Sequence, residues 1–321
     1  MDSSASQPLA GGACRLTDLG LIRATGPDAV AFLHGQLSND VKLQPLHRAR
    51  LAAFCTAQGR MLASLIYAKQ GPEEVWLACS RDLLDPTLKR LRMFVLRAKA
   101  QLVDAGESLC ALGLAGPRAA ESLGAAAPGE TWDKVDLAGG QLIRLPDAVA
   151  APRWLWIGPQ ERAAEVVGTM PALDPETWNW LEVASGVAMV HAATSGQFVP
   201  QMLNYELVGG VDFKKGCYPG QEVVARSHYL GKLKRRGYLL RSAEAAQPGQ
   251  EVWWSGDERQ PSGQVADAAA LPAEAGGGWL LLAELKIAAT AEGSLHLGNL
   301  QAAAMRLQPL PYALPHESEA A

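Results

Sequence analysis

The strongest chemical signal in the sequence is one stretch, Lys214-Lys215-Gly216-Cys217-Tyr218-Pro219-Gly220-Gln221-Glu222. Its cysteine directly follows two lysines and a glycine. Nearby cations favour the thiolate, which is the nucleophilic form of cysteine, and glycines let a backbone approach a ligand closely. Most free cysteines are instead buried and inert. The polar, basic surroundings of Cys217 favour a working thiol, with Lys215 raising its thiolate character.

Composition limits the class of protein. The chain has 321 residues, of which 48% are hydrophobic and 19% charged, as expected for a globular protein of two or three domains. A net charge of −4 and a pI of about 5.9 do not call for nucleic acid. The N-terminus lacks a signal-peptide pattern, and no uninterrupted apolar stretch is long enough for a membrane span. We therefore expect a cytoplasmic protein with no membrane partner.

The other cysteines give no metal-binding pattern. They are widely spaced, and no CxxC or CxH pair occurs, so no zinc site is predicted. Free thiols fit a reducing cytosol. His191 and His228 are isolated, and a lone histidine is more often structural than a ligand. We expect packing roles for four of the five cysteines: Cys14, Cys55, Cys79 and Cys110.

Hydrophobic periodicity predicts an α+β fold in the first part of the chain. Strand patterns alternate with helical spacing in the order strand, helix, two strands, helix and strand, which is typical of a split βαβ, ferredoxin-like module. Residues 1–14 read as a flexible tail. The predicted strands include residues 19–24, 75–78, 101–104 and 112–115, with two more within 49–69, and the predicted helices are 28–37 and 85–95.

The second half differs in pattern. Helices are predicted over 161–167 and from Asp174 to Gly186. Residues 194–235 lack clean periodicity, and a long irregular segment in a compact protein is more often functional than not. From Arg241 onward, short strands between turns predict a small β-barrel.

Two further groups of residues have binding chemistry. Aromatic side chains combined with amides and carboxylates suit a flat heterocycle such as a pterin, although tryptophans on a helix are more often core residues. A basic run, Lys232, Lys234, Arg235 and Arg236, suits a polyglutamate tail, phosphate or RNA backbone, although a solvated surface is the commoner role. The candidate pterin-binding residues are Trp178, Gln197, Gln201, Asn204, Tyr218, Glu222 and Arg226.

The stretch from Phe213 to Arg226, FKKGCYPGQEVVAR, resembles the signature of the YgfZ family of folate-binding proteins, relatives of the glycine-cleavage T-protein. Supporting similarities are Thr194–Asn204 (TSGQFVPQMLN), Phe32–Val41 (FLHGQLSNDV) and the ending Leu310-Pro311-Tyr312. Together they extend over nearly the whole chain, from about Leu19 to Leu314.

The resemblance implies three domains around a central channel that binds tetrahydrofolate, and a C-terminal β-barrel. We expect the T-protein-like domain to combine 15–48 with 116–235, a ferredoxin-like domain at 49–115, and the barrel at 236–321. Trp178 matches a tryptophan that lines the family's folate site. Cys217 matches the motif cysteine of proteins that maintain iron–sulfur enzymes and, through one of them, tRNA thiolation.

These similarities set our leading hypothesis and two alternatives. The hypothesis is a tetrahydrofolate-binding accessory protein for iron–sulfur cluster assembly or repair. The expected partners of this protein are folate and iron–sulfur client or assembly proteins. Cys217 is expected to be at most a transient cluster ligand, and no resident metal is expected. The alternatives are a folate-dependent aminomethyltransferase and a direct tRNA-binding protein, the weakest of the three.

Two departures from the family bear on these hypotheses. Leu19 stands where a second folate-contacting tryptophan occurs, so the sequence leaves folate binding unsecured. Ala63-Ser64 replaces the acidic pair of the T-protein. Without that carboxylate no base or charge partner is present there, which argues against glycine cleavage.

Overall fold

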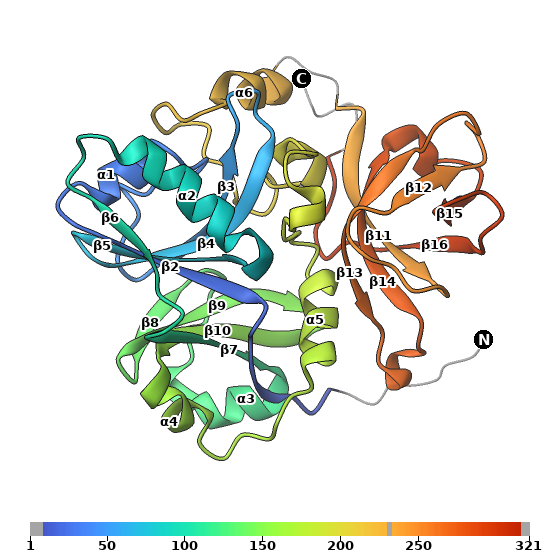
Figure 1. Cartoon of the computed structure of the whole chain (residues 1–321). Helices are drawn as coiled ribbons and strands as arrows, with labels where there is room; N and C mark the ends of the chain where they lie inside the picture. The colour runs from blue at the N-terminus through green and yellow to red at the C-terminus, as the bar shows by residue number, and fades with distance from the viewer. Residues whose placement is uncertain (1–8, 230–232, 316–321) are drawn as a thin grey trace.

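A computed structural model describes residues 9–229 and 233–315. Two helix-covered β-sheets and a closed β-barrel surround a common centre (Figure 1). The predicted α+β fold with a C-terminal barrel is confirmed. Within the described residues, no helix has the length and apolar character needed to cross a membrane.

The first sheet contains the predicted split βαβ module. Its strand order is β3-β4-β5-β2-β6, and the β2-α1-β4-β5-α2-β6 succession has the ferredoxin-like arrangement. Helix α2 buries Leu84, Leu88 and Leu91, which share one helical face. The elements are β2 (Leu19–Thr25), α1 (Ala29–His34), β3 (Ala49–Cys55), β4 (Met61–Gly71), β5 (Glu74–Ser80), η1 (Arg81–Leu83), α2 (Leu84–Val95) and β6 (Gln101–Asp104).

The second sheet has the order β1-β7-β10-β9-β8 and is entirely antiparallel. Leu112 and Leu114 of β7 and Trp154 and Trp156 of β10 contribute to a core shared with α3 and α4. The elements are β1 (Gly12–Arg15), β7 (Leu109–Ala115), α3 (Gly116–Leu123), η2 (Gly124–Ala126), β8 (Lys134–Leu137), β9 (Gly140–Ala148), β10 (Ala151–Pro159), η3 (Gln160–Arg162) and α4 (Ala163–Val167).

The barrel closes in the order β11-β14-β13-β12-β15-β16 around its own small core. A closed barrel leaves no unpaired sheet edge. The elements are β11 (Arg235–Ser242), β12 (Glu251–Trp254), β13 (Gly263–Ala270), η6 (Ala273–Ala275), β14 (Trp279–Lys286), η7 (Ile287–Thr290), β15 (Leu295–Leu297) and β16 (Ala304–Gln308).

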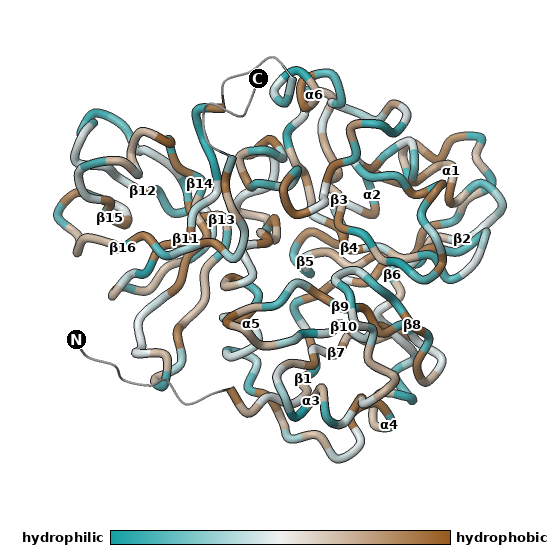
Figure 2. The backbone as a smooth tube through the Cα atoms, turned by 180° about the vertical axis from the view of Figure 1, so that it is seen from behind, coloured by the Kyte–Doolittle hydropathy of each residue, from teal (hydrophilic) through white to brown (hydrophobic). Residues whose placement is uncertain are grey.

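Helix α5 (Pro175–Ala184) joins the second sheet to the barrel, packing against β9, β13 and β14. Its start follows from the sequence: Asp174 caps the Glu176 amide at 3.1 Å, and Pro175 occupies the first turn. The chain continues through η4 (Ala192–Thr194), η5 (Pro200–Leu203) and α6 (Gln221–Tyr229). Seen from behind, hydrophobic segments occur in the strands of both sheets and of the barrel (Figure 2).

The structure differs from the expected organisation in three respects. Gly12–Arg15 is strand β1, paired with β7, so the tail expected over 1–14 is wrong for residues 12–14. The irregular segment 194–235 contains α6. The domain boundaries stay a prediction, but strand pairing crosses them: β2 pairs with β5 and β6, and β7 pairs with β1 and β10. Such pairings join segments far apart in sequence, which local periodicity does not reveal.

Candidate functional site

A cavity of about 650 Å³ lies where the two sheets, α5 and the barrel meet. This volume is within the range of roughly 300–1,000 Å³ that is usual for small-ligand sites. Leu19, at the start of β2, lies in its wall, so this departure from the family places an aliphatic side chain at the cavity. The larger apolar side chains of the lining include Leu16, Leu19, Ile66, Leu145, Leu155, Trp178 and Met189.

Trp178 lines the cavity from α5, at the place where we expected it. Its indole packs on β7 at Gly113, where even a Cβ atom would lie 2.6 Å from the ring. The guanidinium of Arg153 lies 5.4 Å from the ring centroid and forms an ion pair with Glu182, another cavity residue. Because Trp178 is only 3% exposed, it offers a ligand a limited part of its ring.

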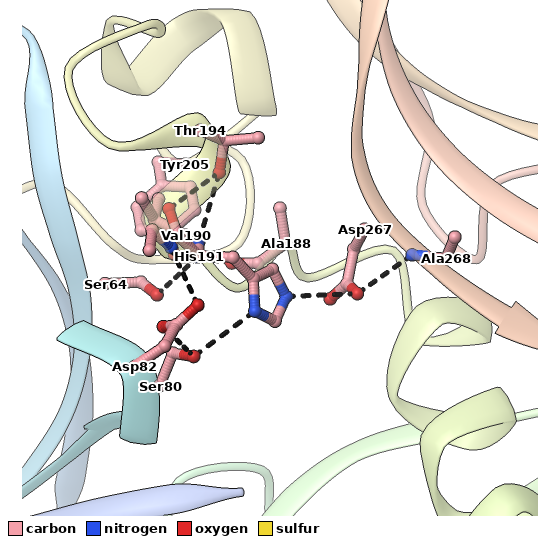
Figure 3. Close-up of polar contacts among 11 residues, drawn as sticks. Ser64, Ser80, Asp82, Ala188, Val190, His191, Thr194, Tyr205, Asp267 and Ala268 are labelled. Atoms are coloured by element: carbon pink, nitrogen blue, oxygen red, sulfur yellow. Dashed lines mark hydrogen bonds and ion pairs between the residues drawn. The ribbon is translucent and has the colours of Figure 1, made fainter. Parts of the chain in front are cut away.

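A polar corner of the cavity is formed by Ser80, Asp82, His191 and Asp267 (Figure 3). His191 Nε2 lies 3.2 Å from Asp267 Oδ1, and Nδ1 lies 3.2 Å from Ser80 Oγ. Ser80 Oγ donates to Asp82 Oδ1 at 2.7 Å, and the Ala192 amide donates to Asp82 Oδ2 at 2.9 Å. The corner thus links the first sheet, the η4 segment and the barrel.

The neighbours of His191 in this corner act on its protonation. Nδ1 contacts the Ser80 hydroxyl, which also bonds to Asp82, while Nε2 faces the Asp267 carboxylate. Burial opposes the charge, but the hydrogen bond and charge of Asp267, with Asp82 and Asp18 nearby, raise the pKa of His191 above its ordinary value. The carboxylates around His191 therefore favour its protonated form.

The Lys214–Gly220 loop, which we call the thiol loop, occupies a different place and contributes no residue to the cavity wall. Lys215 is buried, and its ammonium donates to the carbonyl oxygen of His34, the last residue of α1, at 2.6 Å and to that of Leu37, just beyond the helix, at 2.7 Å. Burial lowers the pKa of Lys215 to about 8, against the opposing effect of Asp40, Asp212 and Cys217. Lys215 thus docks the thiol loop onto the end of α1.

Other contacts brace the thiol loop at both ends. Gly220, with φ of +83°, lies against the β3–β4 turn, where an added Cβ would be 2.5 Å from Gly59 Cα. Phe213 stacks on His228 of α6 at a centroid distance of 3.9 Å. The close backbone approach expected for Gly220 is therefore made to the protein's own hairpin.

Cys217 is exposed, whereas the other four cysteines are buried. Burial raises the pKa of Cys14, Cys55 and Cys79 to about 12 and also raises that of Cys110, so their thiolates are disfavoured at neutral pH. Within the described ranges, no group of three or more His, Cys, Asp or Glu side chains is placed to hold a metal ion. Cys217 alone presents an accessible thiol.

The candidate pterin-binding residues other than Trp178 do not line the cavity. Gln201 is fully buried and donates to the Val224 carbonyl of α6 at 2.6 Å. Asn204, also fully buried, donates to the Gly237 carbonyl and to Tyr312 Oη. Tyr218 is buried, with the Lys215 ammonium 4.7 Å from its ring centroid. The remaining three are exposed: Gln197, Glu222 and Arg226.

Much of the basic run is used internally. Arg235 pairs with Glu284 at 2.8 Å and Arg236 with Glu206 at 2.5 Å. Lys234 is exposed, and Lys232 lies outside the described residues. Two of the four cations are thus paired with barrel or η5-flanking carboxylates and do not form an open phosphate-binding surface.

The Ala63-Ser64 pair is part of the folded framework. Ala63 is fully buried in β4, and Ser64 Oγ accepts the Val190 amide at 2.9 Å. Sequence reasoning missed the polar corner and treated His191 as a lone histidine. The available signal was Asp267, the one charged residue in strand β13, whose other residues are uncharged.

Comparisons with known proteins agree with this geometry. Residues 10–142 match the GCVT N-terminal domain family. The structure resembles the glycine cleavage system aminomethyltransferase T of Bartonella henselae, with a TM-score of 0.75 and 17% identity over 94% of this chain and 86% of the other. At that identity the likeness establishes the fold alone, which is T-protein-like.

Curated relatives narrow this class. The tRNA-modifying protein YgfZ of Photorhabdus laumondii is 30% identical over 309 residues, covering 94% of this chain and 92% of the relative. The protein of the same name from Yersinia pseudotuberculosis is 29% identical over 312 residues, with the same coverage. The chain belongs to the YgfZ family.

Proposed function

We propose that this protein binds tetrahydrofolate in the central cavity and assists the assembly or repair of iron–sulfur clusters in the cytoplasm, with Cys217 as its working thiol. The relatives' name, tRNA-modifying protein, supports a role in tRNA modification. We assign that role indirectly, through an iron–sulfur enzyme. The cavity is the observation that carries the proposal.

The cavity residues fit a reduced folate. Aliphatic side chains and the edge of Trp178 provide apolar contacts for a flat heterocycle. The carboxylates of Asp18 and Asp267 suit N–H donors, whereas Arg15 and Arg81, on the same lining, suit the carboxylates of a glutamyl tail. A ligand that carries both N–H donors and carboxylates matches this combination of lining residues.

The thiol acts at a separate surface. Because the thiol loop is docked through Lys215 and Gly220, Cys217 is presented on a braced segment outside the cavity. One thiolate supplies one ligand, so a cluster handled here as cargo takes its other ligands from a partner protein or a small thiol. Folate in the cavity and a client at Cys217 can then be bound together.

Direct tRNA binding is less well supported. The pairing of Arg235 and Arg236 with carboxylates and the pI of about 5.9 leave little free positive charge for phosphate contacts. Aminomethyl transfer is also less well supported, because the chain has Ala63-Ser64 where the T-protein has its acidic pair. Neither alternative is favoured by a specific feature of the site.

The decisive experiment combines binding with complementation. Calorimetric titration with tetrahydrofolate under anaerobic conditions should give saturable binding that Trp178→Ala weakens. In cells lacking the native gene, Cys217→Ala should fail to restore iron–sulfur enzyme activity, whereas the exposed-site control Glu222→Gln should restore it. If the protein binds no tetrahydrofolate, the proposed ligand is wrong. If Cys217→Ala fully restores iron–sulfur enzyme activity, the proposed role of the Cys217 thiol is wrong.

A further inference from the structure

The polar corner contains a carboxylate whose second oxygen is still available. Asp267 Oδ1 faces His191 Nε2 and accepts the Ala268 amide at 2.9 Å. Asp267 Oδ2, by contrast, receives no hydrogen bond from the residues that the structure describes. The Asp267 side chain is 13% exposed, and it lines the cavity. A carboxylate oxygen in such a position is a ready acceptor for a ligand N–H group.

Strand geometry directs this carboxylate. The β13–β14 register shifts between Val265 and Asp267, because Ala266 is an extra residue in β13. A bulge of this kind bends a strand and redirects the next side chain. His191 then fixes the carboxylate on its Oδ1 side (Figure 3). Asp267 is therefore a positioned acceptor and not a freely rotating surface acid.

Two neighbouring carboxylates already have protein partners. Asp82 accepts one hydrogen bond on each oxygen, from Ser80 and from the Ala192 amide. Glu182 is paired through Oε1 with the Arg153 cation, which offsets its charge. Asp267 combines a position fixed by His191 with an oxygen that accepts no hydrogen bond from the described residues.

We propose that Asp267 of the barrel is the residue that accepts the amino or ring N–H group of a 2-amino-4-oxopteridine in the cavity, with His191 as its positioning residue. This inference rests on the proposed folate binding and names the contact that selects the heterocycle. It also means that the barrel completes the ligand site, because β13 supplies the acceptor.

The charge around the corner supports a donor-rich ligand end. Asp267 contacts the His191 ring, and the charges of Asp82 and Asp18 also raise its pKa, which gives three carboxylates near one imidazole. A neutral ring that presents N–H groups is favoured there, whereas an anionic group is repelled. Carboxylates of the same ligand belong at Arg15 or Arg81.

Titration calorimetry with two probes tests the contact. The probes are 5-formyltetrahydrofolate, a stable reduced folate, and p-aminobenzoylglutamate, which lacks the pteridine. Asp267→Asn should lower the affinity for the first probe on the order of 10- to 100-fold, as expected when a hydrogen bond to a charged group is lost. The affinity for the second probe should not change. The control is Asp257→Asn, which alters a barrel carboxylate of similar exposure, 14%, outside the cavity lining; it should alter neither affinity.

The outcomes separate the two proposals. If the unaltered protein binds no reduced folate, the proposed function fails, and this inference fails with it. If the unaltered protein binds reduced folate and Asp267→Asn binds it equally well, only the inference is overturned. The same holds if Asp267→Asn lowers the affinity for both probes equally. His191→Gln retains an N–H donor and the Asp267 charge, so its loss should be smaller than that of Asp267→Asn; equal losses would reveal a merely structural network.

Discussion

The ammonium of Lys215 lies 2.6 Å from the carbonyl oxygen of His34, and this contact joins the thiol loop to the end of α1. It unites positions 181 residues apart in the chain. Carbonyls at a helix C-terminus lack intrahelical partners and carry partial negative charge. Lys215 therefore caps the C-terminal end of α1, and it also lies close to Cys217 in the sequence.

Replacement of Lys215 by Met should destabilise the protein. It leaves the part-buried His34 carbonyl and the buried Leu37 carbonyl without their donor, which costs roughly 1–3 kcal/mol in the free energy of unfolding. Lys214→Met is the matched control, because Lys214 is exposed and should change stability little. Urea unfolding of the two variants measures the difference, and equal midpoints would contradict the docking role.

Replacement of Gly220 by Ala should also destabilise the thiol loop. Gly220 has φ of +83°, and its new Cβ would lie 2.4 Å from the Thr56 carbonyl oxygen. Gly209→Ala is the control: its φ is +77°, but nothing lies within 4 Å of its Cβ position. Both variants carry backbone strain of about 1 kcal/mol, and only Gly220→Ala adds a backbone clash. The midpoint of thermal unfolding should therefore be lower for Gly220→Ala than for Gly209→Ala. The reverse order would contradict the observed packing.

Much of the fold follows from local sequence. The helical spacing of Leu88 and Leu91, and the Asp174-Pro175 start of α5, are signals contained within a few residues, and the structure contains both helices. Strand β1 could not be predicted in this way, because Gly12–Arg15 is short and its partner β7 lies about 100 residues later. Its stability comes from pairing and not from its own pattern.

The same distinction applies to the site. The exposed Cys217 could be anticipated from its polar neighbours. The His191–Asp267 contact joins residues 76 positions apart through a bulge in a barrel strand, and nothing in either local sequence indicates the other. Gln201 and Asn204 looked like ligand-binding amides because burial and internal hydrogen bonding are not visible in a residue list.

Cys217 should be the one cysteine that reacts rapidly with Ellman's reagent in the native protein. It is exposed and the other four are buried, and access to the thiolate controls the rate of thiol exchange. Stopped-flow absorbance should show one fast equivalent per chain, absent in Cys217→Ser, with the remaining thiols appearing on denaturation. A fast equivalent that persists in Cys217→Ser would place the accessible thiol elsewhere.

The His191–Asp267 contact should make stability depend on pH in a defined direction. The folded-state pKa of His191 is raised above the unfolded value of about 6.5, so folding favours the protonated form. Its stabilisation is fully present below pH of about 6.5 and is lost as pH rises through the folded pKa.

Asp267→Asn removes the leading stabilising partner and should lower the pKa of His191. NMR titration of the His191 ring measures that pKa in both proteins, with urea unfolding across the same pH range. An unchanged pKa in Asp267→Asn would contradict the contact, whereas a lowered pKa with a smaller decline in stability towards high pH is the expected result.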